Sequence, residues 1–91
     1  MREVTVIQRH CEGSEQVQEL LASCLDFPAY YGGNFAALDD CLGYIDEPTR
    51  IVIDRRRVTN HDQDAWFDRL CTVIARASQE NELLDMVIRY K

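Results

Sequence analysis

Three short runs containing β-branched residues, at 4–7, 49–54 and 85–90, alternate with longer stretches of helical spacing. β-branched side chains favour strands, and strands joined through helices lie parallel because the helix carries the chain back to the same end of the sheet. Such crossovers are right-handed in nearly all proteins. The order strand, helix, helix, strand, helix, strand therefore predicts an α/β fold, a small three-stranded parallel sheet packed with three to four helices. A fourth helix would be a short one at 58–64.

Short polar residues, glycine and proline mark where the helices begin and end. The expected N-caps, whose side chains can accept a backbone hydrogen bond, are Ser14, Asn34, and Thr59 or Asn60. Pro28 is expected to end the first helix because the residue before a proline avoids helical geometry, and Gly43 is expected to end the second. The third helix is expected to end near 79–81.

Apolar side chains at helical spacing give each expected helix one face that packs on the core. In the first helix this face holds Val17, Leu20, Leu21, Cys24 and Leu25. In the second it holds Phe35, Leu38, Cys41 and Leu42, and in the third Trp66, Leu70, Val73, Ile74 and Ala77. Cys24 and Cys41 fall on these faces, Cys71 lies beside Leu70 in the third helix, and no C-x-x-C pair occurs, so we expect reduced thiols that act as small apolar side chains and no metal site.

The length of 91 residues suits one domain, 1–91, with one modest core. Its formal net charge of −6 repels nucleic acid and attracts basic proteins. No apolar run approaches the roughly 18 residues of a membrane helix, and the N-terminus runs into a strand without the apolar stretch of a signal peptide. We therefore expect a cytoplasmic protein, monomeric when free, that binds neither nucleic acid nor a membrane.

The residues that most often carry catalysis are poorly placed for it. His10 and Cys11 are neighbours, and neighbours on a strand point to opposite faces, while His61 stands at a helix start where polar residues are common. Asp39 and Asp40 lie about 100° apart around a helix, so their carboxylates diverge. No phosphate-loop, dinucleotide-binding or zinc-protease motif occurs in the sequence. The sequence thus predicts no catalytic residues and no cofactor.

A basic turn at 55–57 consists of three arginines. It suggests an RNA-binding adaptor, or a solvated turn that offsets nearby acids. The second interpretation is favoured because RNA binding requires a basic face and the whole chain is acidic.

The segment 30–44 has the composition of a protein interface. Asp40 lies opposite Leu38 and Leu42 on the helical wheel and therefore points outward, with Asp39 on a flanking position. The tyrosines around this helix are Tyr30, Tyr31 and Tyr44. Rigid aromatic rings around a charge that can be desolvated are typical of binding hot spots. The plainer alternative is that one tyrosine packs in the core and the acids only solvate the helix.

The pattern Pro28-x-Tyr30-Tyr31-Gly32-x-Asn34, followed by Ala37-Leu38-x-Asp40-Cys41-Leu42, resembles the signature segment of the barstar family. The resemblance is strongest over 25–42. It implies a barstar-like fold and an inhibitor that fills the active site of a bacterial guanyl-preferring, barnase-like ribonuclease. The family's aspartate that occupies the site of the substrate phosphate falls on Asp40. The other contact positions that it implies are Tyr30, Tyr31, Gly32, Asn34, Gly43 and Tyr44, with Glu80 as an outlying acid that steers association.

Several positions depart from the family pattern. Ala36 stands where the family has a second helix aspartate, Asp39 replaces an aromatic contact, and one residue is missing between Leu42 and Tyr44. Asp39 lies three residues after Ala36, on nearly the same helix face, and can restore the lost charge. These differences imply a partner that is related to barnase, or that is bound in the same mode, but that has a different surface.

The partner class implied is a basic ribonuclease toxin, secreted or delivered by a neighbouring cell and neutralised in the cytoplasm. The alternative is an immunity protein that uses the same fold against a different toxin. A small enzyme or ligand-binding domain, with a cleft beside the sheet, is a third interpretation that the missing motifs disfavour.

Overall fold

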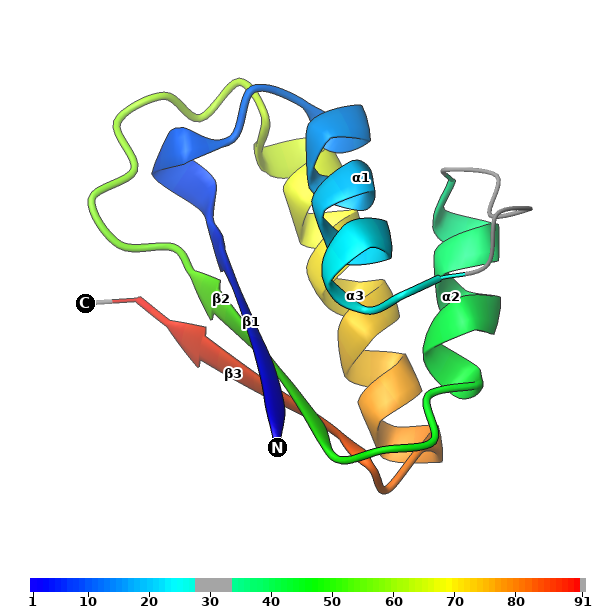
Figure 1. Ribbon diagram of the computed structural model, residues 1–91. Coiled ribbons are helices and arrows are strands. Elements are labelled where there is room, and N and C mark those ends of the chain that lie inside the picture. Colours follow the sequence, from blue (N-terminus) through cyan, green and yellow to red (C-terminus); the bar gives the residue numbers. More distant parts are fainter. Residues whose placement is uncertain (28–33, 91) are drawn as a thin grey trace.

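The computed structural model describes residues 1–27 and 34–90. The elements are β1 (Arg2–Ile7), the 3₁₀ helix η1 (Gln8–His10), α1 (Ser14–Cys24), α2 (Phe35–Gly43), β2 (Thr49–Asp54), α3 (Asp64–Glu80) and β3 (Leu84–Arg89). Figure 1 shows the three α-helices lying on one side of the sheet. The predicted α/β fold is confirmed, but the fourth helix is η1, and the expected helix at 58–64 is absent from this described segment.

The sheet is fully parallel, with β2 between β1 and β3. Val4 pairs with Ile51 and Val6 with Ile53, and all four side chains are buried against the helices. Because successive side chains of a strand point to opposite faces, the residues between them line the face that the helices leave open. The core lies between the covered face of the sheet and the three α-helices, which supply most of its buried side chains.

The ends of α1 differ from the expected ones. Its N-cap is Gly13, and Ser14 is the first helical residue, whose Oγ accepts a hydrogen bond from Gln18 Nε2 at 3.2 Å. Asp26 has a left-handed backbone with φ 54°, and Phe27 N–H donates to the Ala22 carbonyl at 3.0 Å. This bond closes the helix four residues before Pro28, which lies outside the described residues. Asp26, and not the proline, terminates α1.

The start of α3 is also later than expected. Its N-cap is Gln63, whose side chain makes no capping bond. Asn60 instead shapes the preceding loop, where its Oδ1 accepts from the Asp62 N–H at 2.9 Å. Short polar side chains can stabilise either a turn or a helix cap, and here Asn60 stabilises the turn.

Two of the predicted buried faces are rotated around their helix axes. In α1, Leu20 is 41% exposed and Cys24 is exposed, whereas Gln18 is buried. In α3, the fully buried Phe67 was missed, while Trp66 and Val73 are only partly buried at the core margin. The residues that α3 buries are Phe67, Leu70, Cys71, Ile74 and Ala77. The rotation follows from packing against a twisted sheet, which helical spacing alone does not specify.

All four cysteines are free, as the sequence predicts. Cys41 and Cys71 are buried, and burial raises the pKa of the Cys71 thiol to about 11. These two thiols therefore act as apolar packing groups. In residues 1–27 and 34–90, no helix combines the length and the apolar character needed to cross a bilayer.

Candidate protein-binding site on the second helix

The helix α2 is fixed by its inner face and its cap. Leu38 and Leu42 are fully buried in the core, and Cys41 is buried beside them. Asn34 caps the helix as predicted, with its Oδ1 accepting from the Ala37 N–H at 2.8 Å. The helix ends at Gly43, as predicted, and Tyr44 is its C-cap. With one face locked, the opposite face must point to solvent.

That outer face carries the predicted contact positions. Ala36, Asp40 and Gly43 are exposed, and Asp39 is half-buried on a flanking position. Within residues 1–27 and 34–90, neither Asp39 nor Asp40 has an ion-pair partner. An exposed carboxylate without an internal partner is free to pair with a cation on another molecule.

Tyr44 projects from the end of α2 and is 81% exposed. Its backbone N–H donates to the Cys41 carbonyl at 3.2 Å, and the next residue, Ile45, is buried. The backbone is thus anchored on both sides of the ring, while the ring itself lies in solvent. The other two tyrosines of the predicted site, Tyr30 and Tyr31, and the neighbouring Gly32 lie outside the described residues.

The ends of α2 and α3 are tied together by Asn81. Its Nδ2 donates to the carbonyls of Leu42 and Ile45, at 3.1 and 3.0 Å. Glu80, the last residue of α3, therefore lies at the same end of the molecule as Tyr44 (Figure 1). Glu80, the exposed acid that is predicted to steer association, therefore lies near the edge of α2, the helix that is predicted to bind the partner.

A hollow beside Tyr44 was not predicted from the sequence. It has a volume of about 370 Å³, and its lining includes Leu25, Asp26, Phe27, Tyr44, Asp46 and Glu47. Arg2 lies in it too, with its Nη1 3.1 Å from a Glu47 carboxylate oxygen and 3.6 Å from one of Asp26. The acidic pair directly after Tyr44 and Ile45 was the sequence signal that could have indicated it. The predicted binding face is thereby extended by further acidic side chains.

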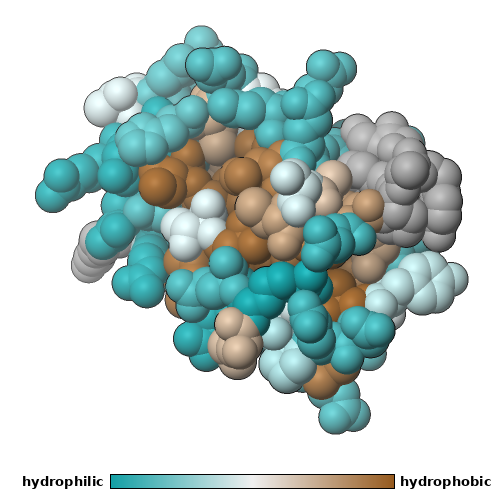
Figure 2. Space-filling view, viewed as in Figure 1, coloured by the Kyte–Doolittle hydropathy of each residue, from teal (hydrophilic) through white to brown (hydrophobic). Residues whose placement is uncertain are grey.

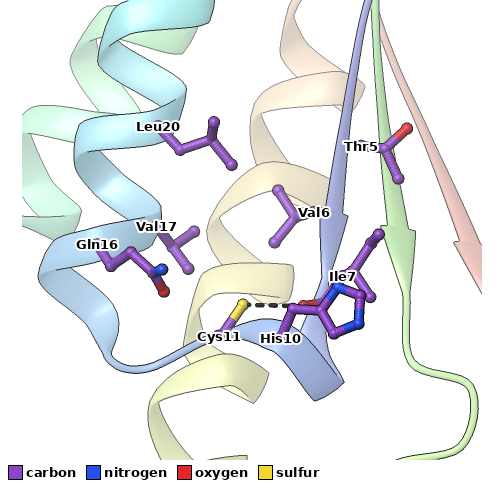
Figure 3. Close-up of a pocket in the computed structure, with 8 residues that line it drawn as sticks. All are labelled: Thr5, Val6, Ile7, His10, Cys11, Gln16, Val17 and Leu20. Carbon is purple, nitrogen blue, oxygen red and sulfur yellow. Dashed lines mark hydrogen bonds between the residues drawn. The ribbon is translucent and has the colours of Figure 1, made fainter.

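A second hollow is lined by both His10 and Cys11, the two residues considered above as a possible base and nucleophile. Figure 2 shows apolar atoms gathered in the furrow beside α1, and Figure 3 shows the side chains that line it, which come from β1, η1 and α1. Cys11 Sγ donates to the Ile7 carbonyl at 3.1 Å, and burial raises the pKa of this thiol. A thiol that is protonated and already bonded to a carbonyl is a poor nucleophile.

His61, and Arg55 of the basic turn, are held by internal contacts. His61 Nδ1 lies 2.9 Å from an Asp64 carboxylate oxygen, and this contact lowers the pKa of Asp64. Arg55 pairs with Asp68 at 2.7 Å and stacks over the ring of Phe67. Nowhere in the described ranges do three or more His, Cys, Asp or Glu side chains converge as metal ligands.

Two comparisons with known proteins bear on the site. The family model described as "Barstar (barnase inhibitor)" matches residues 1–91, the whole chain. A protein of Bacillus subtilis (strain 168), named "Putative ribonuclease inhibitor YrdF", is 36% identical over 81 residues, which cover 88% of this chain and 89% of that protein.

Proposed function

This chain belongs to the barstar family of barnase inhibitors, whose members are not enzymes, and we propose that it binds and inhibits a ribonuclease. Its relative in Bacillus subtilis carries the name of a ribonuclease inhibitor, which supports the same activity here. The observation that carries the proposal is the exposed carboxylate of Asp40, which pairs with no described residue, on a helix whose opposite face buries Leu38 and Leu42.

The mechanism we propose is that Asp40 substitutes for a phosphate group of the RNA. An RNA-cleaving site gathers cationic side chains around the phosphate that it attacks, and a carboxylate is a compact anion of matching charge. Because α2 is held by its core contacts and its Asn34 cap, the carboxylate is presented with little loss of conformational entropy on binding. The target is then a guanyl-preferring ribonuclease of the barnase type.

Around Asp40, the proposed contacts divide into rigid and small side chains. Tyr30, Tyr31 and Tyr44 supply stiff aromatic area, while Gly32, Ala36 and Gly43 let the partner approach the backbone closely. Asn34 and Asp39 supply polar contacts on either side. The partial exposure of Asp39 supports its proposed role in restoring the charge that Ala36 lacks.

Net charge supports fast association with a basic enzyme. The chain carries −6, and Glu80 lies exposed at the same end of the molecule as Tyr44. Opposite net charges raise the rate of encounter and do so less at high ionic strength. We propose that the protein acts in the cytoplasm as an immunity protein, where it neutralises a ribonuclease before export or after delivery by another cell.

The proposal is tested by the rate of RNA cleavage in a panel of barnase-type ribonucleases with and without the purified protein. We expect inhibition of at least one of these enzymes that is competitive with RNA, because the inhibitor and the phosphate share one site. Asp40→Ala should relieve it, whereas Asp62→Ala, an equal charge change in the exposed loop before α3, should not. Inhibition that Asp40→Ala leaves intact would contradict the mechanism, and no inhibition of any member would contradict the barnase-type target.

A further inference from the structure

Arginine side chains gather at the carboxyl ends of the strands, at the opposite end of the molecule from α2 (Figure 1). Arg9 follows β1, Arg56 and Arg57 follow β2, and Tyr90 follows β3. Together these four side chains line a hollow of about 260 Å³. Among the described residues that line it, none is acidic.

A buried carboxylate holds two of these arginines in place. Asp54, at the end of β2, is only 3% exposed. Its two oxygens accept from Arg56 Nε and Nη2 at 3.0 and 2.9 Å, and Arg9 Nη1 lies 3.5 Å away. These contacts lower the pKa of Asp54, so the group is an anion at neutral pH. The guanidinium groups are thus positioned before any ligand arrives.

The positive charges of this cluster outnumber the negative ones. Three guanidinium groups (+3) face one carboxylate (−1), which leaves a local charge of +2 in a chain of net charge −6. Arg57 is exposed, its backbone has φ 58°, and it forms no ion pair with any described residue. Its neighbour Arg55 is turned toward α3, where it pairs with Asp68. Arg57 therefore supplies a charge that the fold does not neutralise.

Several properties of the cluster suit a phosphate group. Ligands of open parallel sheets commonly bind outside the carboxyl ends of the strands, which is where this hollow lies. The planar fork of Arg57, which pairs with no described residue, matches the geometry of phosphate oxygens, and the Tyr90 hydroxyl adds a further hydrogen-bond donor. A long polyanion fits less well, because the chain as a whole carries a net charge of −6 and repels additional phosphates.

We propose that the hollow lined by Arg9, Arg56, Arg57 and Tyr90 is a binding site for a single phosphate group, either free or carried by a small molecule. The site is independent of the proposed ribonuclease face, since the two lie at opposite ends of the fold. Inhibition of a ribonuclease and binding of phosphate can therefore succeed or fail separately.

The proposal is tested by titrating inorganic phosphate, and separately glycerol 3-phosphate, into the full chain at pH 7.5. Sodium chloride keeps the ionic strength constant, and NMR follows the arginine Nε–Hε signals. We expect the signals of Arg9 and Arg57 to shift with saturation for at least one of the two ligands. The ligand that saturates distinguishes free phosphate from a phosphate ester.

Two matched variants decide whether the hollow is the site. Arg57→Gln should weaken binding about tenfold, because it removes one charge-assisted contact, whereas Arg76→Gln on the exposed side of α3 should have no effect. Shifts that stay linear in ligand concentration, or equal affinities of the two variants, would overturn the proposal. Tighter binding of an RNA oligonucleotide without terminal phosphates would also overturn it, in favour of a polyanion surface.

Discussion

Replacing Asn81 by aspartate should destabilise the fold by separating α2 from α3. The asparagine Nδ2 is the donor for both the Leu42 and the Ile45 carbonyls, and its Oδ1 accepts from the Leu83 N–H at 3.0 Å. Aspartate has the same shape and keeps the bond from Leu83. It has no donor, however, so both carbonyls lose the bond from Nδ2 and face a negative charge, while the Leu42 carbonyl keeps the Ile45 N–H at 3.4 Å.

The size of the effect follows from these contacts. Each lost hydrogen bond is worth about 1 kcal/mol, so two lost bonds cost about 2 kcal/mol before any repulsion is added. In a domain of this size, a change of about 2 kcal/mol lowers the melting temperature by roughly 8–16 °C. The slope of the denaturation curve should stay constant, because the surface exposed on unfolding is unchanged.

The assay is urea denaturation followed by circular dichroism, with Asn60→Asp as the matched control. Asn60 is exposed, and the bond that its oxygen accepts from Asp62 N–H survives the change. The reasoning is refuted if Asn81→Asp loses less than about 0.5 kcal/mol or no more than the control. Such a result would mean that packing alone holds α2 against α3.

Three further predictions concern acid stability, the core and the thiols. Contacts with Arg56 lower the pKa of Asp54 in the folded state, so its stabilisation is present above the unfolded value of about 3.9 and is lost as the pH falls toward the folded value. Asp54→Asn should therefore flatten the dependence of unfolding free energy on pH below about pH 4, measured by urea titrations from pH 2 to 7. An unchanged dependence would contradict the role of this carboxylate. Phe67→Ala should cost about 3–5 kcal/mol in the same assay, because the ring is fully buried, and a cost below 1 kcal/mol would contradict the described core. In the native protein Cys24 should react fast with a disulfide reagent while Cys41 and Cys71 stay protected, and rapid modification of either buried thiol would refute the packing described.

The strands and the second helix could be predicted from sequence because local signals agree there. Pro48 precedes the β-branched run of β2, which begins at Thr49 as expected. In α2, the cap Asn34 and the inward residues Leu38 and Leu42 select one rotation of the helix, and that rotation fixes Asp40 outward. A helical wheel was therefore sufficient to predict that Asp40, the main exposed residue of the candidate site, points outward.

The buried faces of the longer helices α1 and α3 were harder to predict, because the apolar residues of each helix fit two overlapping stripes. In α3, spacing permits a face centred on Trp66 and Val73 or one centred on Phe67 and Cys71, and contact with α2 and β3 selects the second. In α1, the polar Gln18 is buried while Leu20, which lines the hollow beside β1, stays exposed, a choice that hydrophobicity alone reverses. Arg56 looked like part of a solvated turn because its partner, Asp54, becomes buried only when the strands assemble.

The most direct test of the central claim is the dissociation constant of the wild-type protein and of Asp40→Ala with a ribonuclease that the wild type inhibits. Asp40 is exposed and forms no ion pair with any residue of 1–27 or 34–90, so its loss should leave the urea midpoint unchanged. If its carboxylate fills the phosphate site, the dissociation constant should rise at least about 30-fold, the size expected of an interface hot spot. A dissociation constant within about threefold of the wild-type value would contradict the claim that Asp40 takes the place of the phosphate.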